Sequence, residues 1–143
     1  MTQVFSFEAL PARKGDTLIL HFGTQEDPKL AVIDGGPSKV FQPSLRPRLK
    51  DIRAERGLQD TTALPVDLLM ISHIDDDHIN GILELTKELK KSKSFSEPSI
   101  VKVATLWHNT FDDIIGNTEF SAGTASVLAS MGEEDFGEDF DHD

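Results

Sequence analysis

The chain has 143 residues, a length that favours a single domain. Its 38% hydrophobic content is typical of a globular protein, and no apolar run reaches the roughly 18 residues that a membrane span requires. The absence of cysteine excludes disulfides and thiolate metal sites. The first residues show neither the basic nor the apolar region of a signal peptide, so we expect a cytoplasmic protein without a membrane partner.

The net charge of −11 is concentrated at the end of the chain. Residues 133–143 hold seven acidic residues and no Lys or Arg, which leaves 14 basic and 18 acidic residues in the rest. We therefore expect one domain over residues 1–130 and an acidic, disordered tail over residues 131–143. No basic stripe is present, so we expect no general nucleic-acid-binding surface. A phosphodiester or other small-molecule substrate is still compatible with this charge, because a bound metal ion supplies local positive charge.

The first third of the chain has the pattern of a β-meander. Apolar alternation predicts strands over residues 3–10, 17–22 and 30–33, with about one strand every twelve residues. Gly15-Asp16 marks the first turn between them, and Asp34-Gly35-Gly36-Pro37 closes the third strand.

A helix and a buried strand follow the meander. Apolar residues recur near a helical period over residues 43–56, with Pro47 placed early enough for a first turn and Gly57 as a stop signal. The apolar run 66–71 predicts a buried strand.

The remaining elements alternate in the same way. An apolar stripe over residues 79–89 predicts a helix that begins near His78, followed by a Ser/Pro loop over 92–99 and a strand over 100–107. A short helix is expected at residues 124–131. The order of strands and helices predicts an α/β or α+β fold with a strand–loop–helix unit at its centre.

That central unit carries four potential metal ligands within six residues. His73, Asp75, Asp77 and His78 all offer nitrogen or oxygen donors suited to a divalent first-row metal. Three consecutive aspartates repel one another in a partly buried loop, and a bound cation removes this repulsion. The loop is therefore predicted to bind zinc (Zn2+), with Mn2+ or Fe2+ as alternatives.

Two other interpretations of this stretch stay open. Aspartates often cap helices, and Asp77 would be the cap of a helix that starts at His78. The Asp-x-Asp spacing also suits calcium, although the run lacks the glycine and the distal glutamate of an EF-hand loop.

The stretch resembles the metal-binding motif of the metallo-β-lactamase superfamily, His-x-His-x-Asp-His-x-x-Gly. This chain has Asp75 where most members have the second histidine, a variant similar to the hydrolase domain of bacterial DNA-uptake (competence) proteins. The turn over residues 12–16, Ala-Arg-Lys-Gly-Asp, and the Asp34-Gly35-Gly36 step resemble the family's opening motifs. The resemblance covers residues 3 to 115.

The resemblance implies the N-terminal half of an αββα sandwich and a metal-dependent hydrolase that acts on phosphodiester or nucleic-acid substrates. By this resemblance, His73 and Asp75 would hold a first metal, and Asp77 and His78 would hold a second. Asp77 would be the catalytic residue that orients the attacking water or accepts its proton. Asp34 would hold a ligand in place, unless it is only a turn residue.

Two neighbouring residues have weaker predicted roles. Ser72 is expected to cap or orient the loop rather than to ligate a metal. His108 follows a predicted strand and is either an additional ligand or a residue at the rim of the site.

The C-terminal ligands of a complete dinuclear site of that family are not found in this sequence. No Gly-Asp step follows residue 110, and no His-His-Gly segment occurs. We therefore expect an incomplete domain whose partner is a complementary half-domain or a second copy, with weak activity by itself. The alternative is a non-catalytic remnant or interaction module that keeps a weak metal site.

Overall fold

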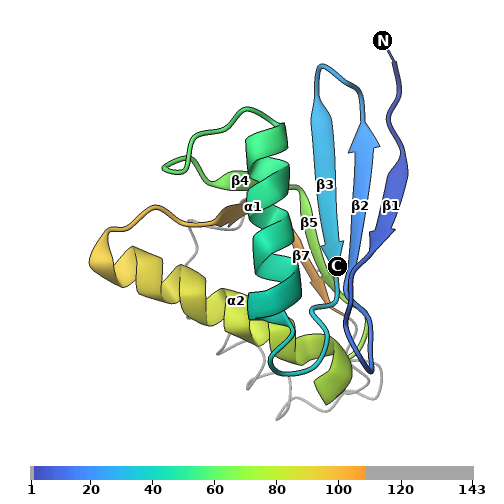
Figure 1. Ribbon diagram of the computed structural model, residues 1–143, viewed down its shortest axis with the longest axis vertical. Coiled ribbons are helices and arrows are strands. Elements are labelled where there is room, and N and C mark those ends of the chain that lie inside the picture. The colour runs from blue at the N-terminus through green and yellow to red at the C-terminus, as the bar shows by residue number, and fades with distance from the viewer. Residues whose placement is uncertain (1, 109–143) are drawn as a thin grey trace, which may run out of the picture.

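The computed structural model describes residues 2–108. The predicted helix at 124–131 and the predicted tail over 131–143 lie outside these residues. Residues 2–108 form a mixed α/β structure in which a five-stranded sheet packs against two helices, and the predicted α/β class is thereby confirmed (Figure 1).

The sheet joins an antiparallel meander to a parallel half. Its strands lie in the order β1-β2-β3-β5-β7. The first three strands pair antiparallel, as their alternation predicts, whereas β5 and β7 join the sheet parallel to β3. The strands are β1 (Ser6–Ala9), β2 (Leu18–Gly23), β3 (Pro28–Ile33), β5 (Leu68–Ile71) and β7 (Leu106–His108).

The predicted helix over 43–56 consists of two parts. A π-helical turn η1 (Phe41–Leu45) leads into α1 (Arg46–Glu55), and Pro47 lies in the first turn of α1 as expected. Pro43 and Pro47 both lack a backbone N–H, so a regular α-helix cannot run unbroken through this stretch. The prediction of a single helix that starts at residue 43 is therefore wrong: the helical segment begins at Phe41 and has two parts.

Both long apolar runs in the second half, predicted as single strands, are divided. Residues 64–71 form β4 (Leu64–Val66) and β5, and β4 pairs with β6 (Val101–Val103) in a separate two-stranded sheet. The break falls at Asp67, whose N–H donates to the carbonyl of Leu30 at 2.8 Å and whose carboxylate accepts the N–H of Leu30 at 2.8 Å. Asp67 thereby moves the chain from one sheet to the other. Residues 104–105 lie between β6 in the two-stranded sheet and β7 in the five-stranded sheet.

The second helix, α2 (Asp76–Phe95), is longer at both ends than predicted. Its N-cap is Asp75, whose carbonyl accepts the N–H groups of His78 and Ile79, so Asp77 lies in the first turn and is not the cap. Residues 92–95, predicted as loop, form the last turn, and Ser96 ends the helix in a left-handed conformation.

One face of the sheet forms the core. Ile19, Val32, Leu69 and Leu106 are register partners across β2, β3, β5 and β7, and all four are buried. Apolar side chains of both helices belong to the same cluster, so α1 and α2 cover this face. Each such fully buried side chain contributes about 1.5–3 kcal/mol to folding. The buried helix residues are Leu45, Leu49, Ile52, Ile82 and Leu85.

The opposite face of the sheet is also apolar. Phe7 and Leu20 are register partners on it, as are Ile33, Met70 and Trp107. Phe7 and Trp107 are exposed, and the other three are half-buried. Strands that are apolar on both sides are typical of sheets that are covered on both faces. The exposed face is therefore a candidate surface for a partner.

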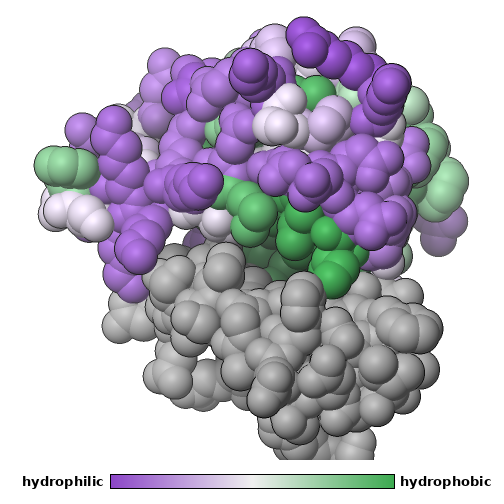
Figure 2. Space-filling model, turned by 90° about the horizontal axis from the view of Figure 1, so that it is seen from below, coloured by the Kyte–Doolittle hydropathy of each residue, from purple (hydrophilic) through white to green (hydrophobic). Residues whose placement is uncertain are grey.

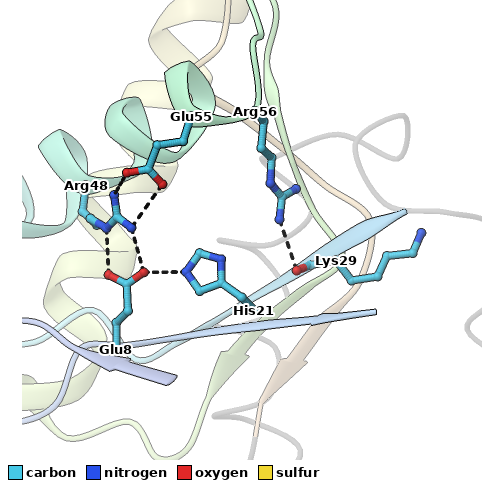
Figure 3. Close-up of polar contacts among 6 residues, drawn as sticks. All are labelled: Glu8, His21, Lys29, Arg48, Glu55 and Arg56. Carbon is cyan, nitrogen blue, oxygen red and sulfur yellow. Dashed lines mark hydrogen bonds and ion pairs between the residues drawn. The ribbon is translucent and has the colours of Figure 1, made fainter. Parts of the chain in front are cut away.

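A polar cluster joins α1 to the meander on the helix side of the sheet (Figure 3). The Arg48 guanidinium donates to both oxygens of Glu8 at 2.7 and 2.8 Å, and its remaining arm contacts Glu55 at 2.7 Å. His21 on β2 contacts the same Glu8 carboxylate. The hydrogen bonds from Arg48 lower the pKa of Glu8 from 4.5 to about 2.

This lowered pKa predicts a specific pH dependence of stability. The contribution of Glu8 is fully present above pH 4.5, the pKa before folding, and is lost as the pH falls from 4.5 to about 2. In full the shift corresponds to about 3 kcal/mol, which solvent screening of this partly exposed pair reduces to roughly 1 kcal/mol. Urea unfolding should therefore show Glu8→Gln less stable than wild type at pH 7, with the difference vanishing near pH 2.

The matched control is Glu55→Gln, which removes the more exposed carboxylate from the same guanidinium. It should cost less stability at pH 7 than Glu8→Gln. A stability difference between wild type and Glu8→Gln that is constant from pH 7 to pH 2.5 would contradict this assignment.

Candidate metal centre

The candidate ligands lie where the parallel strands end. Asp34 directly follows β3, Ser72 and His73 directly follow β5, and His108 is the last residue of β7. Because parallel strands end at one edge of a sheet, the fold gathers these residues at that edge. The start of α2 lies at the same edge, toward which β3 points in Figure 1. Seen from this edge, the described surface is mostly hydrophilic, with one concentration of hydrophobic side chains (Figure 2).

Two glycines let the start of α2 approach the turn after β3. A Cβ atom on Gly81 would lie 1.8 Å from the carbonyl oxygen of Gly35, and a Cβ on Gly35 would lie 2.3 Å from the backbone nitrogen of Ile82. The Gly35 N–H donates to the carbonyl of His78 at 2.7 Å, and the Gly81 N–H donates to the carbonyl of Gly36 at 3.0 Å. This backbone contact fixes His78 next to Asp34.

A third glycine, Gly15, lets the first turn of the chain pack against the start of α2. A Cβ on Gly15 would lie 2.0 Å from the carbonyl oxygen of Asp77, and Gly15 has a φ of 111° that favours glycine. The sequence pattern identified Gly15 and Gly35 only as turn residues. Their contacts with α2 depend on the tertiary structure and could not be predicted from local sequence. For Gly81, the only sequence signal was its place in the histidine motif.

The buried carboxylate of Asp34 organises the histidines. Asp34 is 2% exposed, and one of its oxygens accepts the backbone N–H of Ser72 at 2.8 Å. Its other oxygen accepts the Ser72 hydroxyl at 2.6 Å and lies 3.0 Å from Nδ1 of His78. Asp34 therefore has the geometry to hold a ligand in place, the role that the sequence resemblance implies.

These hydrogen bonds define which nitrogen of each imidazole carries its proton. Ser72 has one hydroxyl proton and donates it to Asp34, so its oxygen is left to accept a proton from Nδ1 of His73 at 2.9 Å. Nδ1 of His78 faces the Asp34 carboxylate and donates to it. In its neutral form, each ring would therefore present Nε2 as an unprotonated ligand atom, and the ring centroids lie 3.7 Å apart.

Three of the four predicted ligands come together. One donor atom from each of His73, Asp77 and His78 lies within 4.8 Å of the other two. His78 is buried, whereas the side chains of His73 and Asp77 are 45% and 47% exposed, so the group opens to solvent on one side. Two imidazoles and one carboxylate match the donor chemistry of a site for one divalent ion with open positions.

Asp75 and His108 are outside this three-donor group. Asp75 is the N-cap residue of α2, and its side chain is 74% exposed, with Oδ2 3.7 Å from Nε2 of His73. This long contact is the only observation that supports the predicted pairing of Asp75 with His73 on a separate metal. His108 lies beside Ile71 in the sheet register, at the same edge as Ser72.

The contact between Gly35 and Gly81 predicts a large effect of one methyl group. Alanine normally stabilises a helix relative to glycine, but at position 81 its Cβ would collide with backbone. We expect Gly81→Ala to destabilise the fold by about 2–3 kcal/mol in urea unfolding. Gly57→Ala is the control, because its Cβ would meet nothing within 4 Å and only the φ of 69° is strained, at a cost of about 1 kcal/mol. Equal losses in both variants would contradict the close approach.

The Ser72 hydroxyl gives a second prediction. Ser72→Ala removes the acceptor of the His73 Nδ1 proton, so His73 should populate both neutral tautomers in 15N NMR spectra of the metal-free protein. Metal affinity should fall by about tenfold. Ser72→Thr keeps the hydroxyl and should restore both properties. A His73 that keeps one tautomer in Ser72→Ala would show that another group fixes the ring.

Comparisons of the chain with protein-family models, with curated proteins and with solved structures return no match in any of the three. Within residues 2–108, no helix is long and apolar enough to cross a membrane.

Proposed function

We propose that this chain is a metal-dependent hydrolase of the metallo-β-lactamase type, with one ion held by His73, Asp77 and His78. The observation that supports this most directly is the hydrogen-bonded support of the two imidazoles. One buried carboxylate orients both rings, directly for His78 and through Ser72 for His73. Such support behind a histidine is typical of metal ligands, where it fixes the ring and its tautomer.

The donor set favours zinc, with Mn2+ or Fe2+ as alternatives. Imidazole nitrogens suit zinc and iron, and the carboxylate also suits manganese. No cysteine is available to select a softer metal. When bound, such an ion would act as a Lewis acid and lower the pKa of water toward neutrality.

The residues of the site have distinct proposed roles. His78 is buried and hydrogen-bonded to Asp34, so it would serve as the fixed ligand. Asp77 is half exposed and offers two oxygens, of which one can ligate while the other orients the attacking water or accepts its proton. Asp34 and Ser72 do not touch substrate in this proposal and act by positioning the histidines.

A phosphodiester is the substrate class that we favour, with only weak turnover. Two-metal phosphodiester hydrolysis requires two ions about 3.5–4 Å apart, each with its own ligands. Three donors fill the protein positions of a single catalytic ion. Within residues 2–108 no second group of three such donors is present.

A specific observation also favours a second candidate function, that of an interaction module. The sheet face opposite the helices is apolar and includes the exposed Phe7 and Trp107. A complementary half-domain or a second copy of the chain could cover this face. Turnover separates the two candidates, because the interaction module would keep a weak metal site but would not hydrolyse a substrate.

Metal analysis tests the proposed function. Purified protein that has been dialysed against zinc or manganese should retain about one equivalent per chain. His73→Ala/His78→Ala should retain almost none, because two of three ligands are removed, whereas Asp75→Ala should retain most of it. Equal metal content in wild type and the double variant would contradict the metal site.

Turnover of a chromogenic phosphodiester completes this test. We expect weak zinc- or manganese-dependent hydrolysis that Asp77→Ala abolishes. Hydrolysis that persists in Asp77→Ala would contradict the proposed role of Asp77, and metal-loaded wild type without any hydrolysis would favour the interaction module.

A further inference from the structure

We propose that Arg13 and Lys14 form an anion-binding subsite beside the metal centre, and that the group bound there is a phosphate of the substrate. This inference rests on the proposed metal site and adds the residues that select the substrate class.

The loop that carries Arg13 and Lys14 is anchored on both sides at the candidate centre. On one side, Ala12 is buried and lies close to Gly36, since a Cβ on Gly36 would be 3.3 Å from that of Ala12. On the other side, Gly15 packs against the backbone of Asp77. The two cationic residues between these anchors are exposed. They are therefore held next to a proposed ligand while their side chains face solvent.

Arg13 also differs from the other four arginines of the described residues, each of which has a partner. Arg13 has no hydrogen bond or ion pair within residues 2–108, and neither has Lys14. The partnered arginines are Arg46 with Glu88 at 2.8 Å, Arg48 with Glu8 at 2.7 Å, Arg53 with Asp60 at 2.6 Å and Arg56 with the carbonyl of Lys29 at 3.1 Å. Among the described residues, no partner therefore occupies the guanidinium of Arg13, and the proposed subsite uses this group.

The backbone at Arg13 is left-handed, with a φ of 60°. Glycine adopts this conformation without strain, whereas a residue with a Cβ does not. Strained residues of this kind cluster at functional sites, where the surrounding structure holds them in place. The anchors at Ala12 and Gly15 supply that restraint here.

The charge balance of the centre explains why added cations are needed. The two charges of a divalent ion would be balanced by the carboxylates of Asp34 and Asp77. Asp75 and Asp76 are exposed beside the group, and Asp16 lies next to Gly15 and is exposed as well, so the rim without Arg13 and Lys14 is acidic. An anionic substrate would be repelled from such a rim, and the two cations offset this repulsion.

Phosphate is the anion that this arrangement suits best. A guanidinium presents paired N–H donors that match two phosphate oxygens, and a neighbouring lysine adds a mobile point charge. A phosphodiester bound in this way would place its phosphorus near the metal group, as the proposed hydrolysis requires.

The test uses inorganic phosphate as the probe and manganese-loaded protein. Paramagnetic relaxation of the 31P signal measures both phosphate binding and its closeness to the ion. Arg13→Ala/Lys14→Ala should bind manganese as wild type does but bind phosphate about tenfold more weakly. Lys90→Ala/Lys93→Ala is the matched control, because it removes two exposed cations about 20 Å along α2, and it should leave phosphate affinity unchanged.

Arg13→Gly keeps the inference testable if the double variant folds poorly. Glycine relieves the left-handed strain, so this variant should melt about 3 °C higher than wild type. It should nevertheless bind phosphate more weakly, because the guanidinium is gone. Equal phosphate affinity in wild type and both loop variants, with normal manganese content, would overturn the subsite and leave the proposed metal site intact. Loss of manganese binding in wild type would overturn both, and the metal analysis would reveal it.

Discussion

The candidate centre depends on the burial of one carboxylate. Asp34 is removed from water, and three donors compensate for the loss of its hydration: the backbone N–H and hydroxyl of Ser72, and Nδ1 of His78. The same three hydrogen bonds connect the end of β3, the end of β5 and the first turn of α2. A single buried carboxylate therefore holds these three segments together and orients two imidazoles toward a common ligand.

This arrangement requires the backbones to lie unusually close. The turn after β3 and the first turns of α2 approach within a distance that only glycine at positions 35 and 81 permits. Asp34 itself adopts a left-handed φ of 57°, a conformation that Asp tolerates better than most residues. The Asp-Gly-Gly step and the glycine after the histidine motif are thus two sides of one contact. The glycine at position 81 of the motif is therefore explained by backbone packing against Gly35 as well as by the ligand residues that precede it.

The sequence predicted the features that depend on local patterns. Alternation located the three strands of the meander, and helical spacing located α1 and α2, because both periods express one-sided burial. The breaks at Asp67 and at residues 104–105 were missed because they depend on pairing with distant strands. The predicted start of α2 lies two residues late, because three consecutive aspartates give the same capping signal and only the structure identifies Asp75 as the cap. That shift matters, because it places Asp77 in the first turn and leaves Asp75 at the solvent.

For the candidate site, the residue types could be predicted from the sequence, but their grouping could not. The motif suggested two ligand pairs, whereas the first turn of α2 brings Asp77 and His78 together with His73 and leaves Asp75 outward. Asp34 and His78 lie 44 residues apart in the sequence, and they meet because β3 pairs parallel with β5 and because the turn after β3 contacts the start of α2. The resemblance anticipated such a contact, but local pattern alone offered a turn residue as an equal interpretation.

The two histidines are supported unequally, and this difference determines which side of the centre is accessible. The ring of His78 is buried, so packing and Asp34 both restrict it. The ring of His73 is nearly half exposed, and Ser72 is its restraint on the protein side, with the long contact to Asp75 on the outer side. Because Asp77 is exposed to a similar degree, the open face of the group is bounded by His73 and Asp77, next to the turn at Gly15. In the proposed function, a substrate would therefore reach the ion from the side of His73 and Asp77, next to the turn that carries Arg13 and Lys14, whereas His78 and Asp34 are buried.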